Sequence, residues 1–148
     1  MTAGSGSPEE AVPSLEILSR SECIDFLAAG RVGRLAFVVD DRPEIFPINY
    51  ALDGETVLFR TAAGTILSQA GLREVAFEVD HIDEKTRSGW SVVVQGHADD
   101  IAGAIDATSE RLRQLPLITW APGQRGHWFA IRARSISGRR LRVLPLEQ

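Results

Sequence analysis

The sequence is poor in cysteine, with Cys23 as the single thiol among 148 residues. One thiol cannot form an internal disulfide, and it cannot supply the several sulfur ligands of a structural zinc or iron–sulfur site. The absence of a disulfide framework is typical of proteins that work in a reducing compartment. We therefore expect the protein to be cytoplasmic.

Long apolar runs and an excess of positive charge are also missing. Residues 1–13 contain neither the basic nor the apolar part of a secretion signal, and no later run has the length of a membrane span. The formal net charge is -4 and the pI is about 5.4, so the chain has no basic surface for a nucleic-acid backbone. These absences predict a protein that engages neither membranes nor nucleic acids.

The common catalytic and phosphate-loop motifs are absent as well. The chain has no Gly-x-Ser-x-Gly, no His-Glu-x-x-His and no Gly-x-x-x-x-Gly-Lys segment. Its histidines, His81, His97 and His127, lie far apart and are interpreted as surface or core residues. The sequence thus predicts no metal site, and it identifies no catalytic side chain.

What is present is the composition of an ordinary globular domain, with 44% hydrophobic and 24% charged residues. Small, polar and proline residues fill positions 1–13, which we predict to be a disordered tail. The remaining residues, 14–148, are enough for one hydrophobic core. We therefore predict a single domain over this range.

The first half of the domain alternates between turn signals and strand-like runs. Ser19 or Ser21 can cap a helix over residues 20–29 that Gly30 ends. Strand-like runs follow at 32–39, 44–51 and 56–61, separated by turn signals at 40–43 and at Asp53-Gly54. Pro47 lies inside the second run. Because proline lacks the N–H of a ladder hydrogen bond, we expect that strand at an edge, at a bulge or beside a ligand.

The second half predicts further strands and two more helices. Helical patterns cover 62–72 and 103–114, and strand-like runs cover 75–79, 90–98 and 127–133. Residues 80–89 are predicted to be a charged connection, and residues 137–141 a turn. Consecutive strands with short connections favour a mainly β (α+β) fold, in which about six antiparallel strands form a closed or nearly closed barrel.

The segment from Phe59 to Leu67 combines features that can hold a phosphate monoester. Arg60 stands at a strand end, Thr61 and Thr65 add hydroxyl groups, and a following helix start would offer free backbone N–H groups. The simpler interpretation is a surface arginine beside an ordinary helix cap. The segment alone leaves both interpretations open.

Five short motifs, in this order, resemble the pyridoxamine 5′-phosphate oxidase family, in its flavin-nucleotide-binding branch. They are SECIDFLAAGRVGRLAF (21–37), PINY (47–50), VLFRT (57–61), VAFEVD (75–80) and GWSVVVQG (89–96). The resemblance covers about residues 15–143. It implies a six-stranded antiparallel split β-barrel with short flanking helices, which forms a homodimer and binds FMN in a cleft lined by both subunits.

The resemblance also implies a set of cofactor contacts. The backbone of one strand would run along the flavin ring at Phe46, Pro47, Ile48 and Asn49. Arg60 and Thr61 would meet the ribityl phosphate, and Thr65 would assist them. Ser91 would approach the ligand from the second wall of the cleft.

Two positions depart from the family pattern. Ile66 stands where relatives often carry a lysine or arginine, which removes one cationic partner of the phosphate. The triplet Arg140-Leu141-Arg142 replaces the Arg-Leu-His with which the true oxidases hold pyridoxal phosphate. Oxidation of vitamin B6 is therefore not the expected reaction.

These observations favour an FMN-binding oxidoreductase that takes hydride from a nicotinamide donor and passes it to a small, unidentified acceptor. Two alternatives stay open: a flavin- or haem-binding module without turnover, and a deazaflavin-dependent reductase on the same fold. Trp90 and Trp128 would either stack on the flavin or pack in the core. The acidic pair Glu78 and Asp80 is interpreted as part of a solvated strand face.

Overall fold

The computed structural model describes residues 11–62, 74–123 and 125–145. The elements in these ranges are, in chain order, β1 (Ala11–Ile17), α1 (Arg20–Ala29), β2 (Val32–Val39), β3 (Arg42–Asn49), β4 (Ala51–Asp53), β5 (Thr56–Thr61), β6 (Glu74–Asp83), β7 (Ser88–Asp100), α3 (Ala107–Leu112) and β8 (His127–Pro145). The predicted helix over 62–72 falls almost entirely outside the described residues. Among the residues that are described, no helix is long and apolar enough to cross a membrane.

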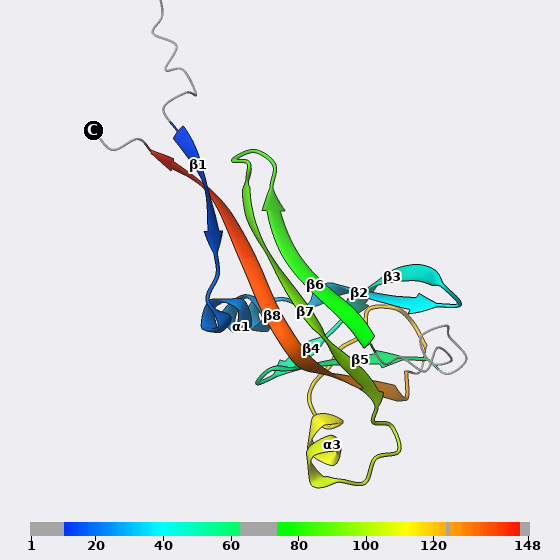
Figure 1. The fold of residues 1–148 in the computed structure, drawn as a ribbon. Helices are drawn as coiled ribbons and strands as arrows, with labels where there is room; N and C mark the ends of the chain where they lie inside the picture. Colours follow the sequence, from blue (N-terminus) through cyan, green and yellow to red (C-terminus); the bar gives the residue numbers. More distant parts are fainter. Residues whose placement is uncertain (1–10, 63–73, 124, 146–148) are drawn as a thin grey trace, which may run out of the picture.

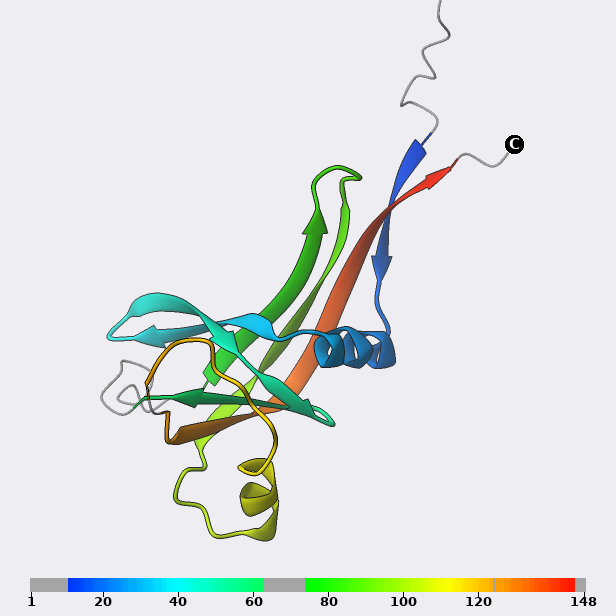
Figure 2. The same ribbon diagram turned by 180° about the vertical axis from the view of Figure 1, so that it is seen from behind.

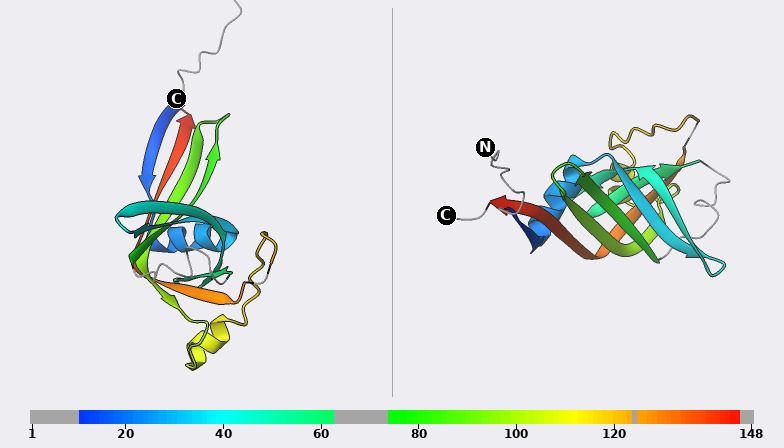
Figure 3. Two further views of the ribbon diagram at one scale, coloured as in Figure 1. Left: turned by 90° about the vertical axis from the view of Figure 1, so that its right-hand side faces the viewer. Right: turned by 90° about the horizontal axis from the view of Figure 1, so that it is seen from above.

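The strands form one antiparallel sheet that curls into a barrel. Its order is β3-β2-β6-β7-β8-β5-β4, and β1 pairs with the far end of β8. The two end strands, β3 and β4, are joined by the single residue Tyr50, so the chain itself brings the ends of the sheet together (Figure 1 and Figure 3). Within the described residues no ladder joins β3 to β5, and we call this unpaired boundary the split. The predicted split β-barrel is confirmed, with eight strands in place of six.

β8 is long because it serves two parts of the sheet. Its first residues pair with β5 and its last residues with β1, while β7 runs beside most of its length. β1 and the adjoining ends of β6, β7 and β8 extend past the barrel (Figure 1 and Figure 2). We call this extension the arm; it comprises residues 11–17, 80–91 and 139–145. The β7–β8 ladder shifts register between Gln95 and Gly96, where a Cβ would overlap the backbone of β8.

The arm corrects the predicted start of the domain. β1 begins at Ala11 and pairs with β8, so residues 11–13 belong to a strand and not to the predicted tail. The apolar side chains of this edge strand, Val12, Leu15 and Ile17, remain exposed. The start of this strand was assigned to the tail because Pro13 and the small, polar residues before it are typical of a disordered segment.

Two further predictions along the arm are wrong. The predicted connection over 80–89 is a hairpin, since β6 runs to Asp83 and β7 begins at Ser88. The predicted turn over 137–141 is a continuous part of β8, and its glycine is needed for packing rather than for turning. A Cβ at Gly138 would overlap side chains that α1 and its N-terminal flank place against the sheet.

The inner face of the barrel holds the main core. Its members from the strands include Leu35, Phe37, Phe59, Phe77, Phe129 and Ile131, and α1 adds Cys23 and Leu27. As predicted, α1 starts at a Ser19 cap, with Glu22 completing a capping box. The buried Tyr50 hydroxyl donates to the carbonyl oxygen of Leu27 at 2.6 Å, and burial raises the pKa of Tyr50 to about 12. This bond fixes α1 to the junction between β3 and β4.

A smaller core cluster lies on the outer side of β5 and β8, beneath α3. It consists of Leu58, Ile101, Leu112, Leu117 and Ala130. α3 is shorter than the predicted helix over 103–114, because Asp106 caps its start by accepting a hydrogen bond from the backbone N–H of Ser109. The cluster positions the chain that leads from α3 to β8.

Candidate functional site

The segment from residue 113 to residue 126, which we call the bridging loop, crosses the side of the barrel that contains the split (Figure 2). Its attachment to β3 is made through Asn49. The amide oxygen of Asn49 accepts a hydrogen bond from the backbone N–H of Trp120 at 2.8 Å. The amide nitrogen of the same side chain donates to the carbonyl oxygen of Arg31 at 3.4 Å, which fixes its orientation.

On the opposite side of the split, the bridging loop is attached to β5 through Arg60. Nε of Arg60 donates to the carbonyl oxygen of Arg125 at 2.9 Å, and Nη1 donates to that of Leu117 at 3.3 Å. The guanidinium lies over the Trp128 ring, 4.7 Å from its centroid. Leu117 is itself buried in the smaller core cluster. The loop is therefore anchored to both edges of the split.

Two buried polar atoms at this end of β5 lack a hydrogen-bond partner within the described part of the chain. They are Oγ1 of Thr61 and Nε of Arg125. Thr61 is only 2% exposed. Buried polar groups in native proteins are nearly always paired, so an unpaired hydroxyl and an unpaired guanidinium nitrogen near the guanidinium of Arg60 point to a missing acceptor. We call Arg60, Thr61 and Arg125 the donor corner.

β3 carries the residues that the sequence assigns to the flavin ring, and the strand's alternation divides them. Phe46 and Ile48 pack against the main core, while Pro47 and Asn49 lie on the other face. β3 is an edge strand, paired only with β2 in the described structure. The expectation that Pro47 lies at an edge is confirmed, and the backbone of β3 is open toward the split.

The same alternation applies to the predicted phosphate residues. Arg60 faces the bridging loop, whereas Thr61, one residue further, is buried on the side of the main core. Both can contact one anion only where the strand ends, and Thr61 is the last residue of β5. Thr65 lies outside the described residues.

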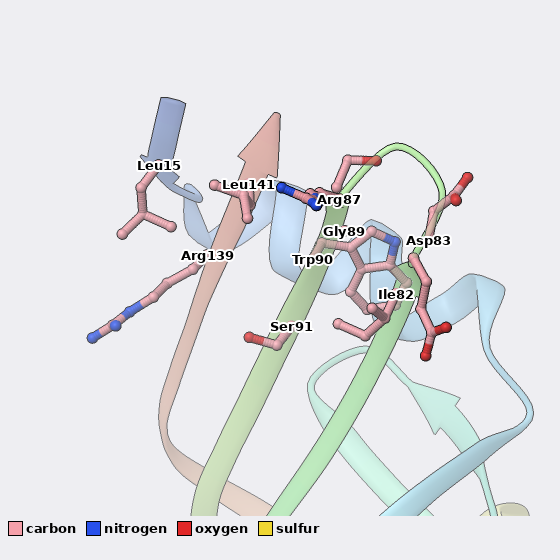
Figure 4. Close-up of a pocket in the computed structure, with 11 residues that line it drawn as sticks. Leu15, Ile82, Asp83, Arg87, Gly89, Trp90, Ser91, Arg139 and Leu141 are labelled. Carbon is pink, nitrogen blue, oxygen red and sulfur yellow. The ribbon is translucent and has the colours of Figure 1, made fainter. Parts of the chain in front are cut away.

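Ser91 stands apart from the other predicted site residues. It lies on the arm, in a groove of about 520 Å³ lined among others by Leu15, Ile82, Ser91, Arg139 and Leu141 (Figure 4). β2 and β6 separate its strand, β7, from β3. The structure therefore attaches the bridging loop to Asn49 and Arg60, with Thr61 next to Arg60 at the end of β5, and it does not bring Ser91 of the same chain to them.

A charged cluster occupies the outer face between these two regions. Nη1 of Arg34 donates to carboxylate oxygens of Glu78 at 3.1 Å and of Asp80 at 3.0 Å. Burial raises the pKa of Glu78 to about 7, and Asp80 adds to the rise through a hydrogen bond and charge repulsion. The sequence predicted a solvated face, but the Glu78 side chain is only 34% exposed. A carboxyl group with this pKa can exchange a proton near neutral pH.

We expect Glu78→Gln to stabilise the protein by about 1 kcal/mol above pH 7 and to change little below pH 4.5. The pKa of Glu78 is higher in the folded state than in the unfolded state. Its contribution to the stability of the fold is therefore fully present below the unfolded pKa of 4.5, and it is lost as the pH rises through about 7. The expected stabilisation of about 1 kcal/mol is already reduced for solvent screening of this partly exposed group. Urea unfolding at a series of pH values measures the difference.

Glu55→Gln is the matched control for this experiment. Hydrogen bonding to Arg20 lowers the pKa of Glu55, so the carboxylate of Glu55 contributes above its unfolded pKa and loses that contribution as the pH falls. The two variants should therefore show opposite dependences on pH. A stability difference for Glu78→Gln that stays constant at every pH would contradict the assignment.

The remaining aromatic candidates serve the packing of the fold. Trp90 stacks on Phe26 of α1 with ring centroids 4.4 Å apart, and Trp128 lies beneath Arg60. Two residues of the site were not found from the sequence, Trp120 and Arg125. They lie between the predicted helix over 103–114 and the predicted strand over 127–133, where no local pattern indicates that the chain crosses to β3 and β5.

A family model described as pyridoxamine 5′-phosphate oxidase matches residues 19–140. An uncharacterised protein of Mycobacterium tuberculosis is 34% identical over 110 residues, which cover 69% of this chain and 72% of that protein.

Solved structures are similar over most of the chain. An FAD-binding protein from Mycobacterium smegmatis is 38% identical with a TM-score of 0.71, over 85% of this chain and 97% of that one. An FAD-binding protein from Mesorhizobium loti is 26% identical with a TM-score of 0.70, over 88% of this chain and 98% of that one. The split barrel, the five ordered motifs and these matches together show that the chain belongs to the pyridoxamine 5′-phosphate oxidase family.

Proposed function

We propose that this protein binds a flavin nucleotide at the split and acts as an oxidoreductase toward a small acceptor. The observation that carries the proposal is the donor corner, where Oγ1 of Thr61 and Nε of Arg125 are buried without a partner in the described structure. A phosphate group would accept hydrogen bonds from both, and a buried donor gains most from a charged acceptor. The FAD-binding relatives support the same ligand class.

In this proposal, Arg125 takes the place of the basic residue that relatives often carry at the position of Ile66. Without a basic residue at position 66, the phosphate would lack a cationic partner, and the bridging loop supplies a second arginine beside Arg60. We propose FMN as the cofactor, held by Arg60, Thr61 and Arg125, with Thr65 nearby in sequence. FAD carries the same first phosphate, so a titration with both nucleotides distinguishes them; deazaflavin and haem are the further ligands to test.

The open backbone edge of β3 at 46–49 is proposed to lie along the flavin ring. A bound flavin supplies hydride chemistry, so the chain needs no nucleophile of its own. The role of its residues is to orient the ring and to exclude water. A nicotinamide is the proposed electron donor, and the acceptor is a small molecule.

We also propose that the protein is a homodimer whose interface is the outer face of the arm. Large apolar side chains are exposed there: Leu15 by 61%, Ile17 by 77% and Ile82 by 64%. By the strand register they lie on the same face as Leu141 and Arg139, opposite α1. Exposed apolar patches of this kind mark interaction surfaces. Ser91 lies on this face, so it would meet the flavin of the partner.

The substitution Thr61→Val tests the proposed function. It removes the unpaired hydroxyl at constant shape, so the protein without ligand should gain about 1 kcal/mol of stability. FMN should bind about tenfold more weakly, because a hydrogen bond to the phosphate is lost. Urea unfolding and the quenching of flavin fluorescence measure the two quantities.

Thr56→Val, at the other end of β5, is the matched control and should leave FMN affinity unchanged. If the unmodified chain binds neither FMN nor FAD at micromolar concentration, the proposed function is wrong. If it binds FMN and Thr61→Val binds equally well, the phosphate lies elsewhere.

A further inference from the structure

Trp120 is an exposed indole on an anchored segment. Its side chain is 70% exposed, although the bridging loop that carries it is fixed at three points. Its own backbone N–H is bound to Asn49, and the loop carbonyls on either side, at Leu117 and Arg125, are bound to Arg60. The exposure therefore does not arise from a loose loop.

The rings of the other two tryptophans are packed against neighbouring side chains. Trp90 is stacked on Phe26, and Trp128 is partly buried beneath a guanidinium. Trp120 instead leaves its side chain largely exposed, on a residue whose backbone is bonded to Asn49 at the end of β3. A large aromatic side chain that is held in place without being covered is typical of a binding surface.

We propose that Trp120 is the stacking partner of a planar, electron-poor ring that occupies the split. The inference rests on the proposed function, because such rings are the flavin itself or an aromatic acceptor such as a quinone. The electron-rich face of indole attracts an electron-poor ring in an offset stack. Through its bond to Asn49, Trp120 is placed at the end of the open edge of β3. Its ring would set a preference for flat ligands over compact ones.

Equilibrium binding tests this inference without turnover. Trp120→Ala and Trp120→Phe are titrated with FMN in one arm, and the FMN-loaded proteins are titrated with menadione, a naphthoquinone, in the other, with calorimetry as the readout. Trp120→Ala should weaken one of the two ligands on the order of tenfold, and Trp120→Phe should restore most of the affinity. The weakened arm identifies which ring stacks.

Ile118→Ala is the matched control, since Ile118 lies in the same loop and is 76% exposed. It should leave both affinities unchanged. If FMN and menadione bind Trp120→Ala as tightly as the unmodified protein, the stacking role is wrong while the flavin site stands. If the unmodified protein binds no flavin, the proposed function is wrong. The stacking role would then stand only if Trp120→Ala, without FMN, binds menadione more weakly than the unmodified protein does.

Discussion

Replacing Leu141 by arginine is expected to convert the protein from a dimer to a monomer. Leu141 is 39% exposed on the outer face of the arm, and it pairs in register with Leu15, so both belong to the proposed interface. In a dimer formed through this face the arginine would be buried among apolar side chains, where an unpaired charge is costly. Sedimentation equilibrium measures the change. FMN affinity should fall with it, because Ser91 of the partner would be lost from the site.

The control for this experiment is Leu144→Arg. Leu144 is 40% exposed on the same strand, but an odd number of residues from Leu141, so it lies on the opposite face. The two variants introduce the same charge at the same exposure, and only the face differs. We expect Leu144→Arg to remain dimeric. A native protein that sediments as a monomer at micromolar concentration would show that the arm does not serve as an interface.

Charge reversal at Arg60 is expected to reduce FMN affinity on the order of 100-fold. The glutamate would remove one cationic partner of the phosphate and add repulsion, and each charge-assisted hydrogen bond contributes about 1.5 to 3 kcal/mol. Arg60 also holds the bridging loop through two carbonyl oxygens. Arg60→Glu therefore loosens the loop as well as the proposed phosphate site, and flavin titration alone does not separate the two effects.

Arg125→Ala separates them, because Arg60 binds the backbone carbonyl of residue 125 and not its side chain. This variant keeps both bonds from Arg60 to the loop and removes only the 3.4 Å bond from Nη2 of Arg125 to the carbonyl oxygen of Pro122. It should still bind FMN about tenfold more weakly. Arg111→Ala is the control for net charge, since Arg111 pairs with Asp53 at the surface. Unchanged FMN affinity in both Arg60→Glu and Arg125→Ala would place the anion away from the donor corner.

The parts of the fold that follow local rules were predictable from the sequence. α1 has its cap, Ser19, and its terminating glycine, Gly30, directly at its two ends. The β4–β5 hairpin is encoded by Asp53-Gly54, where Gly54 has a φ of 59°. Pro47 indicated an edge strand because the missing N–H is a property of that residue alone. In each case the physical cause lies within a few residues of the feature.

The arm and half of the site could not be found this way. β1 and the ends of β6, β7 and β8 are strands because they pair with one another, and their partners lie far away in the sequence or across a hairpin that local patterns did not indicate. Arg125 and Trp120 lie more than 60 residues from the strands to which they attach. The resemblance to a family supplied Arg60, Thr61 and the β3 backbone, but it contained no information on the bridging loop.

The length of β8 has a consequence for the order in which the sheet assembles. β1 pairs only with β8 in the described structure, and the β4–β5 hairpin reaches the rest of the sheet only through it. Neither can complete its pairing until β8, far along the chain, is in place beside it. Such non-local closure is slow, because a long stretch of chain must lose its freedom before any contact is gained. The placement of the C-terminal strand, β8, is thus the step that completes the barrel.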